Sequence, residues 1–388
     1  MTGNGNSTLI INAGSSSVKF RLYLDSLIVV DGVVDAIGKQ ARLSFVKNKK
    51  YQETQGIKVQ ARNYTEAANE IIHLLENIVA LENIKYVVHR VVHGGSYSEP
   101  QRITPVVLKN LENLAPLAPL HQPQSMTLIR FFMRALKARH IACFDTMFHA
   151  KMPTVANTYA IPHTLIQKYR IRRYGFHGLS HASLLDVAER KTGKKYQRVI
   201  TCQLGNGISL CAIKDGRSID TTMGFTPLEG LPMGTRSGSI DSAIIPFICK
   251  KENKTPQQVL SLLEHESGLK ALSGFNDIRD LLEGEKRRDA RYQFALDFFA
   301  YHIRKQIGAY VAALNGLDCL ILGGGISRAP KMRQRILSGL ETLGIVLNQK
   351  VLSHESPVCI SKGKVAIWIV ETDEQGYMYE ITKGLREV

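Results

Sequence analysis

Two stretches of the chain alternate apolar with polar positions over short segments, a pattern typical of β-strands. Residues 8–46 predict strands separated by turns at 25–26, 31–32 and Gly38, and residues 198–222 predict a second group of strands. Each stretch contains one apolar strand that enters a tight turn of small polar residues and returns as another apolar strand. These segments are residues 9–20 and 199–210, and they align when Gly14 is placed on Gly205.

The two aligned segments predict two similar domains. A strand–turn–strand of this kind directs backbone N–H groups and hydroxyls into one space, which suits the binding of phosphate. We therefore expect two domains that face each other across a phosphate-binding cleft.

Apolar residues spaced three and four apart predict the helices, and short apolar runs predict buried strands. The expected helices are residues 64–80, 107–114, 125–137, 241–250, 256–264 and 290–314, and the expected buried strands are 86–88, 141–144 and 318–322. Three prolines within 115–123 predict an extended, rigid path. Strand groups alternate with helices in both halves, which predicts an α/β protein with mixed sheets.

Composition narrows the class of protein. The chain has 388 residues, 44% hydrophobic and 22% charged, with no apolar run long enough to cross a bilayer and no signal-like start, so we expect a cytoplasmic protein. The net charge of +16 comes from short, dispersed basic clusters without interleaved aromatics. This pattern argues against nucleic-acid binding and is compatible with the attraction of anionic substrates. The six scattered cysteines predict buried, reduced thiols.

Arg90 and Asp145 each adjoin a predicted buried strand. Arg90 leaves its strand beside two glycines, where a guanidinium suits two-point capture of a carboxylate or phosphate; the alternative is a surface arginine in a turn. Asp145 lies at the end of a strand, where ligands bind in α/β proteins, and the alternative is a turn or a helix cap.

His177 and His181 are four residues apart, and His181 is expected to begin a helix. The spacing allows zinc ligation, but the sequence lacks the arrangement of a zinc protease, and we favour a hydrogen-bond donor to an anion. Residues 221–238 form a glycine-rich loop that places Arg236 among small residues; the alternative is a mobile surface loop with an incidental arginine. Glycines 323–325 follow a buried strand, a weak signal for a nucleotide-binding turn.

Seven segments, in the same order, resemble those of acetate kinases, and the resemblance runs from Ile10 to about Gln375. The segments are residues 12–17, 89–95, 117–121, 144–146, 174–178, 204–207 and 233–238. The resemblance implies two duplicated ribonuclease H-like domains of the actin and Hsp70 type, with a cleft between them. It also implies domains at 1–148 plus about 372–388 and at 149–371, a homodimer, and Mg²⁺-dependent transfer of phosphate from ATP to acetate, giving ADP and acetyl phosphate.

The resemblance also assigns roles at the reacting centre. Asp145, His177 and Arg236 match catalytic residues, and Arg90 joins Arg236 in clamping the carboxylate and the phosphoryl group. Acetate is already ionised at neutral pH and needs no general base, so we expect Asp145 to orient Mg²⁺, its water or an arginine. Asn12 and Glu374 match ligands of Mg²⁺, which Mn²⁺ can replace.

Further residues match the substrate and nucleotide sites. The acetate methyl group is expected to contact Val92, Leu120, Phe176 and Pro227, with Arg90 on the carboxylate. Valine at position 92 favours acetate over propionate. Ser15, Ser17 and Lys19 are expected to contact phosphates. The nucleotide is expected to contact Lys19, Gln203, Leu204, Gly205, Asn206, Gly207, Asp277, Ile278, Arg279, Gly325, Ile326, Ser327, Arg328 and Ala329.

The sequence departs from the family pattern mainly on the nucleotide side. Gln203 replaces a histidine, Arg328 replaces an acid and Ala329 replaces an amide. The phosphate donor is therefore less defined than the acyl acceptor. Two alternatives remain open at this point, a propionate or butyrate kinase and a catalytically silent nucleotide-binding protein. Retention of the residues for phosphoryl transfer argues against the second.

Overall fold

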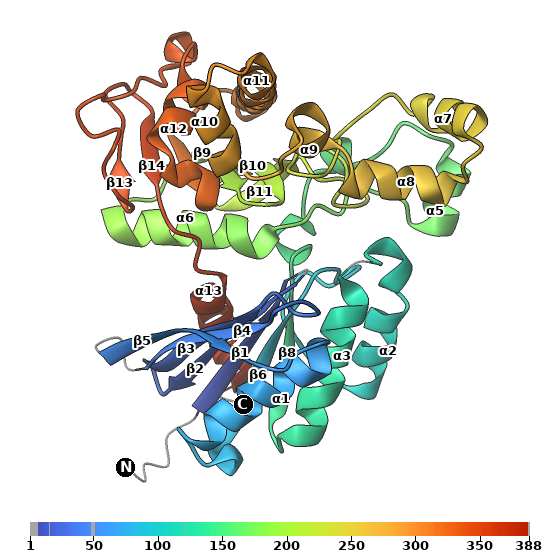
Figure 1. Cartoon of the computed structure of the whole chain (residues 1–388), viewed down its shortest axis with the longest axis vertical. Coiled ribbons are helices and arrows are strands. Elements are labelled where there is room, and N and C mark those ends of the chain that lie inside the picture. The colour runs from blue at the N-terminus through green and yellow to red at the C-terminus, as the bar shows by residue number, and fades with distance from the viewer. Residues whose placement is uncertain (1–6, 15, 48–50, 120, 387–388) are drawn as a thin grey trace. The chain divides into compact units, whose positions relative to one another are not determined.

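The computed structural model describes residues 7–14, 16–47, 51–119 and 121–386, with only the backbone described for 51–55. The chain divides into two compact units (Figure 1). Unit 1 comprises Met1–Ala150 and Asp373–Val388, and unit 2 comprises Lys151–Thr372. Over the described ranges, no helix combines the length and the apolar character that a membrane span requires.

Unit 1 is built on a sheet of strand order β5-β4-β3-β2-β1-β6-β8-β7. The first five strands pair antiparallel, whereas β1, β6 and β8 run parallel. The strands are β1 (Ser7–Ala13), β2 (Val18–Leu24), β3 (Leu27–Asp35), β4 (Arg42–Lys47), β5 (Tyr51–Lys58), β6 (Ile84–Val91), β7 (Gln101–Arg102) and β8 (Arg139–Phe144). The helices are α1 (Tyr64–Glu76), α2 (Pro105–Glu112), α3 (Gln122–Ala135), α13 (Glu374–Ile381) and α14 (Lys383–Arg386), with short 3-10 turns at η1 (Leu81–Asn83), η2 (Ala115–Leu117) and η3 (Met147–His149).

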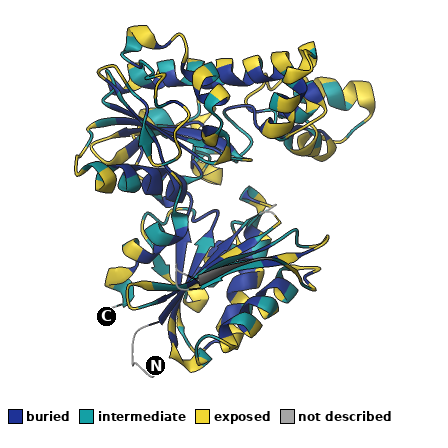
Figure 2. Ribbon diagram, turned by 60° about the vertical axis from the view of Figure 1, so that its left-hand side comes forward, coloured by how far each residue is buried: buried dark blue, intermediate teal, exposed yellow. Residues whose placement is uncertain are grey.

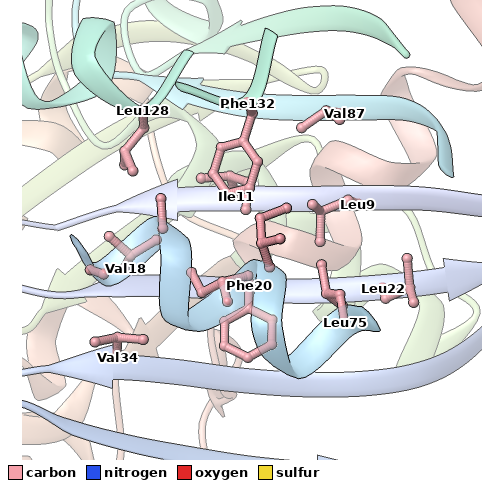
Figure 3. Packing of buried hydrophobic residues seen from close by; sticks show 14 of the residues in the cluster. Leu9, Ile11, Val18, Phe20, Leu22, Val34, Leu75, Val87, Leu128 and Phe132 are labelled. Carbon is pink, nitrogen blue, oxygen red and sulfur yellow. The ribbon is translucent and has the colours of Figure 1, made fainter. Parts of the chain in front are cut away.

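The two faces of β1 have different partners because successive side chains of a strand point to opposite sides. Leu9 and Ile11 pack into a buried cluster with side chains of α1 and α3, including Leu75 and Phe132 (Figure 3). The opposite face carries Thr8, Ile10 and Asn12. Its neighbours are α13 and α14, because Arg386 donates to Thr8 and Tyr379 stacks on Tyr23 at a ring separation of 3.9 Å.

Unit 2 is built on a sheet of strand order β11-β10-β9-β12-β14-β13. The strands are β9 (Arg198–Leu204), β10 (Ile208–Lys214), β11 (Arg217–Thr221), β12 (Cys319–Gly323), β13 (Val358–Cys359) and β14 (Ala366–Ile369). The helices are α4 (Thr154–Asn157), α5 (His163–Tyr169), α6 (Gly178–Thr192), α7 (Ile244–Glu252), α8 (Pro256–His265), α9 (Gly268–Ser273), α10 (Ile278–Lys286), α11 (Ala290–Leu314) and α12 (Pro330–Leu337), with η4 (Gly325–Arg328) and η5 (Glu341–Leu343).

The two sheets share one topology. In unit 1 the order β3-β2-β1-β6-β8 is an antiparallel meander followed by two parallel strands, and β11-β10-β9-β12-β14 repeats this arrangement in unit 2. Helices pack on both sheets, and the central strands, β1 in unit 1 and β9, β10 and β12 in unit 2, are almost wholly buried (Figure 2). The expected α/β class, with two duplicated mixed sheets flanked by helices, is confirmed.

The turn predicted at residues 31–32 is wrong, because both residues lie inside β3. Gly32 pairs with Phe20 on one side and Phe45 on the other. A Cβ atom on Gly32 would lie 2.5 Å from Cζ of Phe20, so the absence of a side chain makes room for a core phenylalanine. Here glycine serves close packing rather than a turn.

The extended path predicted for 115–123 is also wrong. Ala115–Leu117 forms η2, and α3 begins at Gln122. Pro116 and Pro123 occupy the first turns of these two helices. Backbone N–H groups there have no acceptor within the helix, so proline, which lacks an N–H, is tolerated. Other boundaries also differ from expectation. Arg90 lies within β6 rather than after it, α6 begins at Gly178 rather than at His181, and α7 begins at Ile244.

Candidate active site

Unit 1 gathers charged side chains at the carboxyl ends of its parallel strands β1, β6 and β8. The Arg90 guanidinium donates from Nε to Oδ1 of Asp145 at 2.8 Å and from Nη2 to Oδ2 at 2.6 Å. The two side chains are 14% and 2% exposed. Two parallel hydrogen bonds between largely buried side chains fix the orientation of both groups.

Asn12 connects this ion pair to Glu374. Its amide oxygen accepts from Nη1 of Arg90 at 3.0 Å, and its amide nitrogen donates to Oε2 of Glu374 at 2.6 Å. Burial acts against the charge of Arg90, but the carboxylates of Asp145 and Glu374 outweigh it and raise the pKa of Arg90 above its usual value. Arg90 is therefore a permanent cation between two carboxylates.

Glu374 is held in place by the start of α13. Asp373 caps this helix by accepting from the backbone N–H of Gly376 at 3.0 Å. Arg21, on β2, donates to Asp373 at 2.7 Å and to Asp31 at 2.7 Å. These bonds tie the first turn of α13 to the sheet and so position the carboxylate that contacts Asn12.

Lys19 stands directly opposite Asn12 in the pairing of β1 with β2. Directly opposed residues of an antiparallel pair point to the same face of the sheet, so Lys19 shares the face of Asn12. Its side chain is exposed. Although expected as a nucleotide contact, Lys19 lies in unit 1.

The oxygen atoms of Asn12, Asp145 and Glu374 form a set suited to a hard cation. Mg²⁺ binds one or two protein carboxylates and keeps several waters, so it does not require a dense cage. Within the described part of the chain, no group of three or more His, Cys, Asp or Glu side chains is arranged to hold a metal. Asn12 and Glu374, which lie side by side, are oxygen-donor side chains compatible with a hydrated Mg²⁺.

In unit 2, His177 and Arg236 converge on Gly207. A Cβ atom built on Gly207 would lie 3.1 Å from Cε1 of His177 and 3.6 Å from Nη1 of Arg236. The imidazole and the guanidinium thus approach the chain where no side chain intervenes. His177 adopts the left-handed conformation, with φ of 57°, as the residue before α6, which is uncommon for a non-glycine residue and recurs at functional sites.

Arg236 has no carboxylate within ion-pair distance among the residues that the structure describes. Its Nη1 contacts the carbonyl oxygen of Pro227 at 3.5 Å and Sδ of Met233 at 3.7 Å. Burial lowers the pKa of Arg236, while the charge of Glu264 acts in the opposite direction. A partly desolvated guanidinium without a counter-ion is a ready site for an anion.

The loop that carries Arg236 is hydrogen-bonded at its start. Arg173 donates from Nη1 to the carbonyl oxygens of residues 221, 222 and 223, and from Nη2 to Oε1 of Glu229 at 2.5 Å. Tyr159 also donates to Glu229, and its hydroxyl accepts from the backbone N–H of Phe225 at 2.8 Å. These contacts give the loop a defined conformation.

A cavity of about 670 Å³ opens in unit 2 at the carboxyl ends of β9 and β12. The turn after β9, the start of α10 and η4 form its walls. The lining residues are Gly205, Asn206, Asn276, Asp277, Ile278, Arg279, Gly325, Ile326, Arg328 and Ala329. All except Asn276 are candidate nucleotide contacts from the sequence. Asn276 was not predicted. Its position directly before the 277–279 segment is the feature of the sequence that could have indicated it.

Other candidate nucleotide residues do not line this cavity. Leu204 is fully buried in β9, and Ser327 is 2% exposed with its hydroxyl donating to the carbonyl of Gly324 at 2.7 Å. Gln203 accepts from the Thr372 hydroxyl at 2.8 Å, and Gly207 faces His177. The side chains of Leu204 and Ser327 therefore serve the fold of unit 2.

The candidate acetate-pocket residues belong to different units. Val92 is 5% exposed and directly follows β6 in unit 1, whereas Phe176 is 1% exposed and lies in unit 2 with Pro227. Leu120 and Ser15 lie outside the described residues, and Ser17 directly precedes β2.

Zinc ligation by His177 and His181 does not fit the structure. His181 is fully buried, its Nδ1 lies 2.8 Å from the Thr201 hydroxyl and its Nε2 lies 2.8 Å from the Ser209 hydroxyl. Both nitrogens are thus engaged in hydrogen bonds, which leaves no lone pair directed at a metal.

Comparison with known proteins shows the family of this chain. The model of the acetokinase family matches residues 7–379. The chain belongs to the acetokinase family. It is 40% identical over 393 residues to the acetate kinase of Oceanobacillus iheyensis, covering 97% of this chain and 98% of that relative.

Two solved structures of this family have the same fold over nearly the whole chain. One is a propionate kinase from Francisella tularensis, with a TM-score of 0.90, 33% identity and coverage of 97% of this chain and 98% of that one. The other is the acetate kinase of Porphyromonas gingivalis, with a TM-score of 0.88, 32% identity and coverage of 98% and 99%.

Proposed function

We propose that this acetokinase-family protein transfers a phosphoryl group from ATP to acetate, giving ADP and acetyl phosphate. The observation that carries the proposal is Arg236, a partly desolvated guanidinium without a carboxylate partner among the described residues, which meets His177 at Gly207. The same unit carries the 670 Å³ cavity. Phosphoryl transfer depends mainly on positioning and on stabilisation of negative charge, and this arrangement supplies both.

The residues of unit 2 would act on the nucleotide and on the transferred group. The cavity residues would hold adenosine and the proximal phosphates. Arg236 would stabilise the charge on the phosphoryl oxygens, and His177 would donate a hydrogen bond to one of them. Because Gly207 lacks a side chain, a phosphate can approach both groups closely.

The residues of unit 1 would act on the acceptor. Arg90 would bind the acetate carboxylate while Asp145 holds its guanidinium in orientation. Asn12 and Glu374 would hold Mg²⁺, which supplies neutralisation of phosphate charge when bound. Acetate is ionised at neutral pH, so its oxygen attacks without a general base, and Asp145 need not accept a proton.

The size of the acyl group distinguishes acetate from its homologues. Val92 in unit 1 and Phe176 and Pro227 in unit 2 are candidate contacts of the methyl group, with Leu120 as a further candidate. A single methylene in such a pocket changes the transition-state free energy by about 1–3 kcal/mol. We therefore expect propionate to be a poorer substrate, and the similarity to a propionate kinase makes it the second candidate.

We also propose a cytoplasmic homodimer. Unit 2 exposes large apolar side chains on α4, α5 and α7, namely Val155, Leu165, Ile244 and Phe247, at 93%, 41%, 40% and 63%. Exposed apolar groups of this kind favour association. The oligomeric state of the wild type and of Phe247→Asp is measured by light scattering coupled to gel filtration. A monomeric wild type would contradict the proposal.

The activity is tested with purified protein, Mg-ATP and acetate, propionate or butyrate, with the acyl phosphate trapped by hydroxylamine. We expect hydroxamate from acetate above that from propionate. GTP, ITP and pyrophosphate in place of ATP test the donor, since Arg328 and Ala329 border the cavity. Nucleotide binding without hydroxamate from any acceptor would identify a silent nucleotide-binding protein.

A further inference from the structure

We infer that Thr201, Ser209 and His181 form a hydrogen-bond relay that sets which imidazole nitrogen of His177 carries the proton. The inference rests on the proposed role of His177 as a donor to the phosphoryl group. Nδ1 of His177 lies 2.8 Å from Oγ of Ser209, which lies 2.8 Å from Nε2 of His181. Nδ1 of His181 lies 2.8 Å from Oγ1 of Thr201.

The relay crosses three elements of unit 2. His177 directly precedes α6, His181 lies in the first turn of that helix, Ser209 is on β10 and Thr201 is on β9. Thr201, Ser209 and His181 are all fully buried. Their hydrogen bonds are thus protected from exchange with bulk water, and each donor must be matched to an acceptor inside the protein.

The Thr201 hydroxyl determines in which direction the hydrogen bonds of the relay run from donor to acceptor. Among the described residues, the only hydrogen-bond partner of the Thr201 hydroxyl is Nδ1 of His181. A buried hydroxyl that has one partner satisfies its proton by donating to that partner. Nδ1 of His181 is therefore the acceptor, and a neutral His181 carries its proton on Nε2.

Ser209 links His181 to His177. Nε2–H of His181 donates to Oγ of Ser209, whose single proton is then free to donate to Nδ1 of His177. A neutral His177 that accepts at Nδ1 carries its own proton on Nε2. The opposite direction would leave the Thr201 hydroxyl proton without an acceptor among the described residues.

The tautomer matters because of what Nε2 of His177 faces. A Cβ atom on Gly207 would lie 3.3 Å from Nε2 and 3.6 Å from Nη1 of Arg236. Nε2 is thus directed to the region that Arg236 makes favourable for an anion. An Nε2–H there donates to a phosphoryl oxygen, whereas a lone pair there repels it. Thr201, Ser209 and His181 are therefore positioning residues, each acting through its neighbour.

The tautomer is read directly by NMR of protein containing ¹⁵N-histidine, without substrate. We expect Nε2–H and unprotonated Nδ1 for both His177 and His181, with resonances assigned from His177→Gln and His181→Gln. Thr201→Val keeps the shape but removes the hydroxyl, and is expected to move a measurable fraction of both imidazoles to Nδ1–H. Thr201→Ser keeps the hydroxyl and is expected to retain the native tautomers.

Turnover provides the second readout. Thr201→Val is expected to lower kcat about 5- to 10-fold with an unchanged KM for ATP, Ser209→Ala about 10- to 100-fold, and Thr201→Ser less than 2-fold, magnitudes in line with the loss of one oriented donor. Because both residues act through one chain, Thr201→Val/Ser209→Ala should be no slower than Ser209→Ala alone. Ser218, a buried serine on β11 whose hydroxyl accepts from the Cys211 thiol, provides the matched control, and Ser218→Ala should keep kcat.

The two readouts separate the inference from the proposed function. Nε2–H tautomers that reverse in Thr201→Val support the relay even if the wild type forms no acyl phosphate, a result that would reject the function alone. An active wild type in which Thr201→Val changes neither the tautomers nor kcat overturns the relay. Losses that multiply in the double variant overturn it as well.

Discussion

Arg90 and Asp145 in unit 1 are joined by two hydrogen bonds of 2.8 and 2.6 Å between the guanidinium and the carboxylate. The carboxylate is almost fully buried. The pair thus couples the orientation of a candidate substrate-binding group to the stability of the unit. Arg236 differs in this respect, because no carboxylate among the described residues pairs with it.

Arg90→Met should destabilise the protein, whereas Arg236→Met should not. Removal of Arg90 takes away two charged hydrogen bonds from the buried Asp145 carboxylate, at a cost of about 3–5 kcal/mol. Removal of Arg236 eliminates a partly buried positive charge and should change the free energy of unfolding by less than about 1 kcal/mol. Urea denaturation measures both. Each variant should lose at least about 100-fold in kcat. Equal stability of the two variants would contradict the assigned pairing.

Gly207→Ala should slow turnover without weakening nucleotide binding. The new methyl group would lie 3.1 Å from Cε1 and 3.3 Å from Nε2 of His177, tighter than ordinary contact, so the imidazole must move. We expect kcat to fall about 10- to 100-fold and the Kd for ADP, from calorimetry, to stay within 2-fold. Gly308→Ala, on α11 with open space around it, is the control and should keep kcat. Retained activity in Gly207→Ala would place His177 away from the reaction.

Ala329→Phe should block the nucleotide cavity. Ala329 lines the 670 Å³ cavity beside η4, and a benzyl group there occupies space that a nucleoside needs. The KM for ATP should rise at least about 10-fold while the KM for acetate stays within 2-fold, since overfilled sites reject their ligand through steric contact. Steady-state kinetics with each substrate varied in turn provides the measurement. An equal rise in both values would indicate a general loss of structure.

Val92→Ala should shift acyl preference toward propionate. Val92 is 5% exposed, and its truncation makes room for one methylene. We expect the ratio of kcat/KM for propionate to that for acetate to rise about 10-fold. Val91→Ala removes the same volume from the neighbouring, fully buried position at the end of β6. If both variants shift the ratio equally, Val92 does not set the preference.

The buried His89–His140 pair should make stability depend on pH. The two rings share a hydrogen bond of 3.0 Å between β6 and β8. Burial lowers the pKa of His140 to about 4, and burial together with His140 lowers that of His89 further below its usual value. Between pH 6.5 and about 4 the unfolded chain binds more protons, so stability falls as the pH falls.

His140→Phe tests this dependence. The difference in unfolding free energy between wild type and variant should change by about 3 kcal/mol from pH 7 to pH 4, with the wild type losing more. His73→Phe, at an exposed position on α1, should follow the wild-type profile. Parallel profiles for the wild type and His140→Phe would show that His140 titrates normally in the folded state.

Much of the fold could be predicted because local pattern and local structure agreed. The apolar spacing over 290–314 coincides with α11, and the paired segments at Gly14 and Gly205 form the turns after β1 and β9 in two sheets of equal topology. The pattern failed where one residue type serves two purposes. In isolation Gly32 signals a turn and Pro116 an extended path. Close packing of Gly32 against Phe20, and the place of Pro116 in the first turn of a short helix, determined their structure instead.

The candidate nucleotide residues were identifiable because they lie in short contiguous segments. Residues 277–279 and 325–329 keep the order of a motif, and most of them line one cavity. Asn276 was missed because its role depends on the fold around α10. The relay from Thr201 to His177 could not be predicted from the sequence. No spacing along the chain indicates that Ser209, on β10, lies between His177, which precedes α6, and His181, which lies in that helix.

The sequence by itself determined the fold class, the family and the identity of the charged groups, because these depend on local periodicity and on short motifs. Only the tertiary structure decided how the groups are partnered. It paired Arg90 with Asp145 and left Arg236 without a carboxylate among the described residues. Partnering depends on which strand ends meet at a sheet edge, and burial there determines whether a charge is neutralised within the protein or left for a substrate.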